Sequence, residues 1–312
     1  MELSMNGLAF DFPGPVVDEL EECNSMLGDV PALRERVESE GYLFIRELIP
    51  RTKVLEARRI VLESLQREGL LKPQTEIMNG IVNPEAIGKG KSDAIAECLQ
   101  HEKVRAVLNG EEIHAFFDRY FSEPTFVLDL KIIRVQRPGV STGIHYDVVY
   151  MGRGTRRLCS CWIPLGDIAV EQGPLALCAG SNSLPGFAKL RETYGHYDVD
   201  GTLMRGANGS FSGWFSFDLS EISERFGGRW RTANYRAGDI LVFTPLTMHC
   251  GLDNNSDRFR LSSDIRCQPL SEPADPRWIG EHALGNTAAH QLARNEIEAE
   301  TTLEDARKEW GV

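Results

Sequence analysis

The fold class of this chain is decided by the stretch LCSCWIPLGDIAVEQGPLALCAGSN, residues 158–182. It begins with the apolar run Leu158–Leu165, and a second apolar run follows at Leu175–Cys178. Turn residues separate and close these runs, at Glu171-Gln-Gly-Pro174 and at Ala179-Gly-Ser-Asn182. Short runs bounded by such turns are typical of β-strands in a sandwich or barrel.

The same texture extends from residue 125 to about residue 270, on both sides of that stretch. The other apolar or β-branched runs are Thr125–Val135, Ile240–Phe243 and Phe259–Cys267, with turns at Arg137-Pro-Gly139 and Ala237-Gly-Asp239. Many short strands with Gly and Pro turns favour a sandwich or barrel over a parallel α/β sheet. We therefore expect residues 125–270 to form a β core.

Residues 1–124 predict a mainly helical part that packs on this core. Val30–Glu40 predicts a short helix, which is followed by the compact apolar run Tyr42-Leu-Phe-Ile45. From Thr52 to Glu68, apolar residues recur every three or four positions, which predicts a helix with Thr52 as its N-cap. A further pair of helices is expected over Lys91–Tyr120.

We expect residues 1–312 to form a single domain, since the chain is long enough for one sizeable core. Residues 186–232 form a long insert rich in glycine and aromatic residues, which we interpret as a lid over the substrate or as plain packing. Residues 281–312 are polar and predict a C-terminal helix or tail.

Charge and hydropathy exclude several classes of partner. The formal net charge is -12, with 34 Lys and Arg against 46 Asp and Glu, which disfavours nucleic acid and anionic membrane surfaces. No apolar run approaches the length of a membrane span. The first residues lack the basic and apolar regions of a signal peptide, so we expect a cytoplasmic protein.

Two other patterns do not indicate a function. The segment Gly88-Lys-Gly-Lys-Ser92 looks like a phosphate-binding loop, but Glu85 stands where the loop needs its first glycine. The seven cysteines are scattered without a CxxC pair, which predicts buried reduced thiols and no zinc site.

Histidine is the informative residue type. His145 and Asp147 flank Tyr146 at the start of a strand-like run, where residues i and i+2 project from one face. His249 follows the strand-like segment 240–243, after a break at Pro245. Each of these residues alone is as well explained by a local hydrogen bond. Together, two imidazoles and one carboxylate form the facial triad of non-haem Fe(II) oxygenases, which leaves three positions on the metal open.

Arg260 lies on the next apparent strand after His249. A buried arginine needs an anion, and its planar fork suits a carboxylate. That carboxylate is either a co-substrate such as 2-oxoglutarate or a local acid. The candidate local acids are Asp253, Asp257 and Asp264.

At this point the sequence resembles the phytanoyl-CoA dioxygenase family of Fe(II)/2-oxoglutarate oxygenases, over roughly residues 31–270. The matching features, in the family order, are His145-x-Asp147, Cys161-Trp-Ile-Pro-Leu165, Glu171-Gln-Gly-Pro-Leu175, Gly180-Ser-Asn182, Ala237-Gly-Asp239, His249 and Arg260. The chain departs from the family at Asn182, where family members usually carry His. It departs again at Gly251, where a common Ser would supply one co-substrate hydrogen bond.

The resemblance implies a mainly β fold with a helical buttress, a double-stranded β-helix (a cupin-like jelly roll). It implies Fe(II), O2 and 2-oxoglutarate as cofactor and co-substrates. Arg260 would anchor 2-oxoglutarate, Trp162 would line its pocket, and Thr142 is a candidate for a further hydrogen bond. The implied metal ligands and catalytic residues are His145, Asp147 and His249.

The implied reaction hydroxylates or otherwise oxidises a small, largely apolar metabolite and releases succinate and CO2. The carboxylate of Asp147 argues against a halogenase, which carries a small residue at this position. Acyl-CoA, amino-acid-derived, terpenoid and polyketide substrates all fit the scaffold. The side chains that we predict to contact substrate are Tyr146, Tyr150, Trp214 and Phe215.

Two alternative functions remain open at this point. One is a cupin-like metal-dependent isomerase or epimerase that uses the triad without oxygen. The other is a non-catalytic binding protein on the same scaffold. Arg260 discriminates against the isomerase, since that enzyme needs no anchor for a co-substrate.

Overall fold

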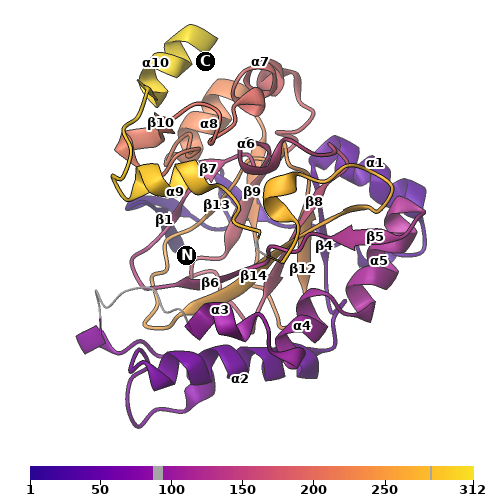
Figure 1. Cartoon of the computed structure of the whole chain (residues 1–312), viewed down its shortest axis with the longest axis vertical. Coiled ribbons are helices and arrows are strands. Elements are labelled where there is room, and N and C mark those ends of the chain that lie inside the picture. Colours follow the sequence, from indigo (N-terminus) through magenta and orange to yellow (C-terminus); the bar gives the residue numbers. More distant parts are fainter. Residues whose placement is uncertain (87–93, 282) are drawn as a thin grey trace.

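The computed structural model describes residues 1–86, 94–281 and 283–312, and its centre is a sandwich of two sheets (Figure 1). The larger sheet has the strand order β4-β12-β8-β14-β5, and β6 also pairs with β14. The smaller sheet has the order β3-β11-β9-β13-β7. All pairs in both sheets are antiparallel except β3 with β11. The predicted jelly-roll fold is confirmed.

The strands of the two sheets have the following bounds. The larger sheet contains β4 (Tyr42–Ile45), β5 (Thr125–Val127), β6 (Ile132–Gln136), β8 (Cys159–Pro164), β12 (Ile240–Phe243) and β14 (Arg260–Pro269). The smaller sheet contains β3 (Val17–Glu19), β7 (Thr142–His145), β9 (Leu175–Ala179), β11 (Arg229–Thr232) and β13 (His249–Gly251).

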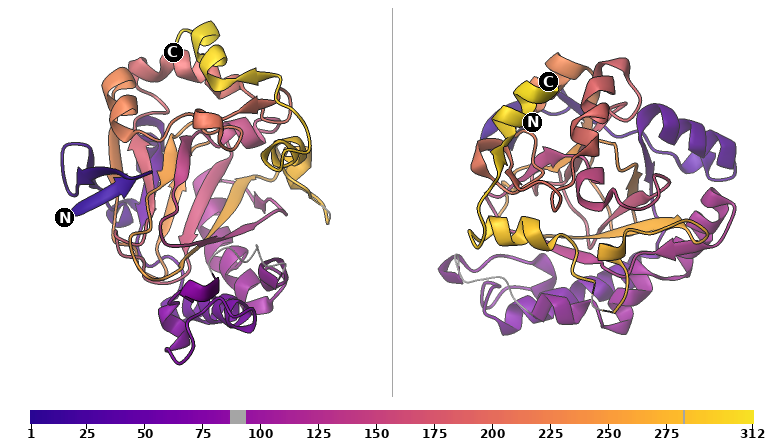
Figure 2. Two further views of the ribbon diagram at one scale, coloured as in Figure 1. Left: turned by 90° about the vertical axis from the view of Figure 1, so that its left-hand side faces the viewer. Right: turned by 45° about the horizontal axis from the view of Figure 1, so that its top comes forward.

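Helices from the first part of the chain cover the outer face of the larger sheet, as Figure 2 shows. They are α1 (Val30–Glu40), α2 (Arg51–Arg67), α3 (Ala94–Cys98), α4 (Glu102–Leu108) and α5 (Glu111–Phe121). Strands β4, β8, β12 and β14 beneath them are buried along their whole length because both faces of the sheet are covered. In β8, Cys161 and Ile163 pack on the helices, whereas Trp162 faces the other sheet.

The rest of the chain packs around the smaller sheet, with α10 at the end of the molecule opposite α2 (Figure 2). The helices here are α6 (Val148–Met151), α7 (Ala188–Glu192), α8 (Leu219–Phe226), α9 (Thr287–Ala293) and α10 (Leu303–Trp310). Short strands are β1 (Glu2–Met5), β2 (Leu8–Asp11), β10 (Met204–Arg205) and β15 (Thr301–Thr302). Short 3₁₀ helices lie at Asn24–Met26, Ile77–Asn79, Pro84–Ala86, Pro185–Phe187, Tyr194–His196, Ala207–Gly209 and Pro276–Trp278.

The space between the two sheets changes character along the sandwich. One part is an apolar cluster that includes Phe44, Trp162, Leu177 and Phe243. The other part is polar because successive side chains of β14 point alternately to the helices and to the space between the sheets. Its residues Leu261 and Ile265 face the helices, and its intervening side chains point inward. These inward side chains are Arg260, Ser262, Asp264 and Arg266. They make the polar chamber in which the candidate site lies.

Several local predictions were wrong. Helix α2 begins at Arg51 after Pro50, so Thr52 is not the N-cap; the fixed φ of Pro50 starts the helix without a side-chain cap. The run Thr125–Val135 is split into β5 and β6. The expected helix pair within 91–120 is replaced by α3, α4 and α5, in the part of it that the structure describes.

Other predictions concern larger parts of the chain. The end of the 186–232 insert is β11, a strand of the smaller sheet in which Trp230 is fully buried. The phosphate-loop-like segment lies in residues 87–93, outside the described residues. The single-domain organisation and the interpretation of residues 186–232 as a lid remain predictions.

All seven cysteines are buried, as predicted, and burial raises the pKa of Cys159 to about 12. No helix within the described ranges has the length and hydropathy to span a membrane.

Candidate active site

Strand pairing brings the two histidines together. His145 is the last residue of β7 and His249 is the first residue of β13, and the two are direct partners in the antiparallel ladder. Their ring centroids lie 4.2 Å apart. Asp147 follows β7 at the start of α6, so that its carboxylate turns back toward both rings. All three side chains are buried.

The donor atoms of this triad converge. The Nδ1 of His145 lies 2.7 Å from the carbonyl oxygen of Gly143, and that of His249 lies 3.0 Å from the carbonyl oxygen of Thr247. Each Nδ1 therefore donates its proton to the backbone, which leaves each Nε2 lone pair free. The Nε2 atoms lie 3.8 Å and 3.6 Å from Oδ1 of Asp147. Two neutral imidazoles and one carboxylate oxygen, all within 4.8 Å, fit the facial triad of a non-haem iron site.

Burial sets the protonation of these groups. It lowers the pKa of His145 to about 3, with a further contribution from His249, and it also lowers the pKa of His249. Burial alone would raise the pKa of Asp147, but Arg266, the two histidines and Ser160 together hold it below its ordinary value. At neutral pH the triad therefore has neutral imidazoles and an ionised carboxylate, which are the forms that bind a metal.

Asp147 is oriented by two residues of the larger sheet. Arg266 of β14 donates from Nη2 to Oδ2 of Asp147 over 3.1 Å, and both side chains are buried. The hydroxyl of Ser160, on β8, donates to the same oxygen. Because these bonds engage Oδ2, Oδ1 remains directed at the two imidazoles.

The replacement Arg266→Met is expected to weaken iron binding by about 10–100-fold, the usual effect of losing a partner of a metal ligand. The carboxylate of Asp147 would lose its buried counter-charge and its fixed orientation. Titration of Fe(II) into the anaerobic protein measures the effect. The control is Arg294→Met, which removes an exposed ion pair with Glu296. Unchanged iron affinity in a folded Arg266→Met protein would contradict this role.

Arg260 begins β14 and is 3% exposed. It donates to the side chains of Ser262 and Gln136, and its Nε has no hydrogen-bond partner among the described residues. Burial lowers the pKa of Arg260 to about 10. Within the part of the chain that the structure describes, no acidic side chain forms an ion pair with it.

The three acids that could have neutralised Arg260 are engaged elsewhere. Asp253 accepts bonds from the backbone of residues 6 and 7, Asp257 pairs with Arg258, and Asp264 pairs with Arg134. A buried guanidinium without an internal anion is costly unless an external anion completes it. The structure thus leaves Arg260 available for a bound carboxylate.

Three further residues surround the head group of Arg260. The indole ring of Trp162 lies 5.8 Å from its guanidinium carbon. A Cβ placed on Gly251 would lie 3.2 Å from both Nη2 of Arg260 and Oγ1 of Thr142. The glycine at 251 therefore lets these two groups lie closer to the strand than a side chain there would allow. The structure brings Thr142, Trp162 and Arg260 together. Their roles toward 2-oxoglutarate remain predictions.

The predicted substrate contacts separate into two groups. Trp214 lines a cavity of about 710 Å³ together with Thr142 and Arg260. Tyr150 packs edge-on against the ring of His145, with centroids 5.4 Å apart. Tyr146 and Phe215, in contrast, are fully buried in the apolar cluster around the smaller sheet. The hydroxyls of Tyr146 and Tyr150 both donate to backbone carbonyls, and Tyr150 belongs to the same cluster. The substrate roles of the four residues remain predictions.

Trp214 is held directly over β7. A Cβ on Gly143 would lie 2.7 Å from carbon atoms of its indole ring, which is closer than any real Cβ contact. Gly143→Ala is therefore expected to displace Trp214 and to destabilise the fold by about 1–3 kcal/mol. Chemical denaturation followed by fluorescence measures both effects. Gly28→Ala, where a Cβ meets nothing within 4 Å, is the control. Equal unfolding free energies for the two variants would contradict this packing.

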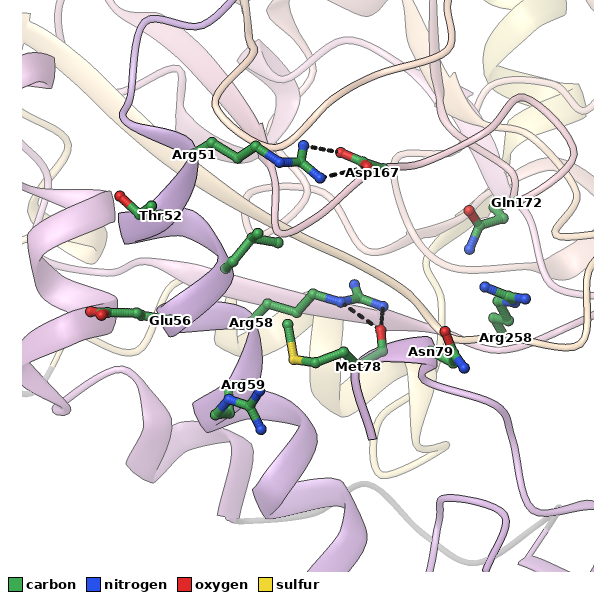
Figure 3. Close-up of a pocket in the computed structure, with 11 residues that line it drawn as sticks. Arg51, Thr52, Glu56, Arg58, Arg59, Met78, Asn79, Asp167, Gln172 and Arg258 are labelled. Atoms are coloured by element: carbon green, nitrogen blue, oxygen red, sulfur yellow. Dashed lines mark hydrogen bonds and ion pairs between the residues drawn. The ribbon is translucent and has the colours of Figure 1, made fainter. Parts of the chain in front are cut away.

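A second cavity of about 650 Å³ lies between α2 and the loop after β8 (Figure 3). Figure 3 shows Arg51 paired with Asp167, and Arg58 bonded to the carbonyl of Met78. Arg58 also donates to the carbonyl of Leu165, so its buried guanidinium is satisfied by the backbone. None of the described residues lining this cavity belongs to the triad. The Arg58 side chain thus connects α2 to the residue that follows β8 and to the 3₁₀ helix Ile77–Asn79.

The structure corrects the expected geometry of two site residues. His145 and Asp147 do not share a strand, because β7 ends at His145 and the chain turns into α6. The sequence also suggests that His249 stands at the end of the strand 240–243, whereas it begins a separate strand, β13.

Sequence reasoning missed Ser160, Gln136 and Arg266. The alternation of polar residues at positions 260, 262, 264 and 266 would have indicated that Arg266 shares the face of Arg260.

Comparison with known proteins identifies the family. The family model for phytanoyl-CoA dioxygenase (PhyH) matches residues 37–262, which is most of the chain. The chain belongs to the phytanoyl-CoA dioxygenase family. It is therefore a 2-oxoglutarate-dependent non-haem iron oxygenase, with iron, 2-oxoglutarate and O2 as its cofactor and co-substrates.

Two curated relatives are hydroxylases. The 1-deoxypentalenic acid 11-beta-hydroxylase of Streptomyces arenae is 25% identical over 263 residues, covering 80% of this chain and 85% of that protein. The enzyme of the same name from Streptomyces exfoliatus is 24% identical over 265 residues, with the same coverage.

Two solved structures share the fold of this dioxygenase family member. The carbocyclase SnoK from nogalamycin biosynthesis has a TM-score of 0.54 at 18% identity, covering 86% of this chain and 91% of SnoK. The epimerase SnoN has a TM-score of 0.52 at 18% identity, covering 80% of this chain and 87% of SnoN.

Proposed function

We propose that this family member oxidises a C–H bond of a small, largely apolar metabolite, and that hydroxylation is the outcome. His145, Asp147 and His249 would hold Fe(II), and Arg260 would hold the distal carboxylate of 2-oxoglutarate. The observation that carries the proposal is the buried Arg260, which lies beside the triad without an acidic partner among the described residues. The curated hydroxylases are named for a small organic molecule, 1-deoxypentalenic acid, which supports a small-molecule substrate.

The protein residues have separable tasks in this reaction. When bound, iron with 2-oxoglutarate supplies the activation of O2 and the removal of a hydrogen atom from the substrate. The backbone carbonyls of Gly143 and Thr247 fix the two imidazole rings. Arg266 and Ser160 keep Asp147 ionised and oriented. The apolar cluster around Trp162 keeps water from the inner side of the chamber.

The proposal is tested by succinate formation from 2-oxoglutarate in the presence of Fe(II), under air and under strict anoxia. We expect succinate only under air, and we expect its rate to rise when a substrate is supplied. A substrate product heavier by one oxygen atom identifies hydroxylation. An isomeric product of unchanged mass that also requires air would identify an epimerase, the activity named for SnoN. A product that forms under anoxia would overturn the proposal in favour of an isomerase.

A further inference from the structure

The cavity that reaches Thr142 and Arg260 has one apolar wall and one cationic wall. It has a volume of about 710 Å³ and runs along β6. The apolar wall includes Leu65 of α2, Ile95 of α3 and Leu99, which follows α3. Trp214, Thr142 and Arg260 also line this cavity. The cavity is therefore shaped for a molecule with a large apolar body.

Its charge is opposite to that of the chain. The cationic side chains that line it are Lys131, Arg134, Arg137 and Arg260, and no acidic residue is among its described lining residues. The chain as a whole has a formal net charge of -12. An all-cationic cavity in an acidic protein concentrates anions, since the walls of a cavity focus the field of the charges that line it.

Arg134 is the cation best placed between the cavity and the triad. Its Nε is paired with Asp264, which fixes the side chain, while the side chain remains 41% exposed and lines the cavity. It is also connected to the triad by neighbouring ion pairs. Its partner Asp264 lies two residues before Arg266 on β14, and Arg266 pairs with Asp147 of the triad.

The charges around the site do not balance without a further anion. Three guanidinium groups, of Arg134, Arg260 and Arg266, face two carboxylates, of Asp147 and Asp264. Fe(II) and the two carboxylates of 2-oxoglutarate cancel one another. One positive charge therefore remains beside the triad when both are bound, and Lys131 and Arg137 add two more along the cavity. The cavity therefore favours an anionic substrate over a neutral one.

We propose that the substrate is an apolar carboxylic acid, and that Arg134 binds its carboxylate where the middle of β6 lines the cavity. This inference rests on the proposed function, because it takes the cavity to be the substrate site. The carboxylate held at Arg134 would place the apolar body against Trp214 and the helical wall, with the triad beside it.

The test is direct binding of two probes of equal length, decanoate and 1-decanol, to the anaerobic protein containing Fe(II) and saturating 2-oxoglutarate. Saturation with 2-oxoglutarate keeps decanoate from occupying Arg260. Isothermal titration is expected to show decanoate binding at least about 10-fold more tightly than the alcohol, the value of one charge-assisted hydrogen bond. Arg134→Gln is expected to abolish this preference.

The matched control is Arg225→Gln. Arg225 is 42% exposed and paired with Glu221, so it resembles Arg134 in both respects but lies on α8. This variant is expected to retain the preference for decanoate. If Arg134→Gln fails to fold because Asp264 loses its partner, the double variant Arg134→Gln/Asp264→Asn removes both charges and provides the same measurement. Equal binding of the two probes, or a preference that survives without Arg134, would overturn the inference.

The proposed function is monitored separately in the same samples. The visible absorption band of Fe(II) with 2-oxoglutarate is recorded before each titration. A missing band indicates failure of the proposed function, whatever decanoate does. A normal band without a preference for decanoate indicates failure of the inference alone.

Discussion

The His249→Ala variant is expected to lose iron binding by more than about 100-fold and to lose all conversion of 2-oxoglutarate. Loss of a partner of a metal ligand costs about 10–100-fold, and loss of the ligand itself costs at least as much. The Nε2 of His249 is one of three donor atoms that lie within 4.8 Å of one another, and the remaining pair cannot hold one face of the metal. Iron content after anaerobic loading and desalting measures the effect.

The matched control is His196→Ala. His196 is an exposed histidine whose Nδ1 contacts the carbonyl of Glu192, away from the triad. This variant is expected to bind iron as the unmodified protein does. Stoichiometric iron in His249→Ala would show that the metal is held elsewhere, and would remove the basis of the assigned site.

The Arg260→Gln variant is expected to raise the dissociation constant of 2-oxoglutarate by at least about 30-fold. Truncating one partner of a buried charge pair costs about 2 kcal/mol or more, which corresponds to that factor. Gln preserves hydrogen bonding but removes the charge and the planar fork that suits a carboxylate. Iron binding is expected to be unchanged, because Arg260 contacts Ser262 and Gln136 and none of the triad.

Arg258→Gln serves as the control for this measurement. Arg258 is two residues away, but it is 46% exposed in its side chain and lines the cavity of Figure 3. Titration of 2-oxoglutarate into the iron-loaded anaerobic proteins compares the two variants. An equal, small change in both would show that Arg260 does not anchor the co-substrate, and its burial would then need another explanation.

The β core and the order of the site residues could be predicted from the sequence because both depend on short patterns of neighbouring residues. Short apolar runs with Gly and Pro turns predicted β8, β9 and β12 within about a residue of their observed bounds. The motif around His145 and Asp147 was visible, although the turn after β7 was not. A two-residue spacing suits both a strand and a strand end followed by a turn, so the spacing alone could not distinguish them.

The contacts that tune the site could not be predicted, because they join distant parts of the chain. Arg266 meets Asp147 across 119 positions, and Gln136 meets Arg260 across 124. The aromatic residues show the same limit. Trp214 lines the cavity while its neighbour Phe215 lies in the core, and nothing in the local sequence distinguishes the two sides of that segment.

The sandwich also explains why the site lies where it does. The inner faces of the two sheets meet in an apolar cluster around Trp162, and the inner face of β14 is polar. Charges in the polar part are paired in a chain, from Arg134 to Asp264 and from Arg266 to Asp147. Arg260 is the guanidinium on this face that the described residues leave without an acidic partner.

The most direct test of this account is the absorption spectrum of the unmodified protein under strict anoxia, with Fe(II) added first and 2-oxoglutarate second. A triad with three open positions and a nearby Arg260 predicts a visible metal-to-ligand charge-transfer band that appears only when both are present. The band should saturate at one iron per chain. Bound iron that gives no band on addition of 2-oxoglutarate would contradict the account.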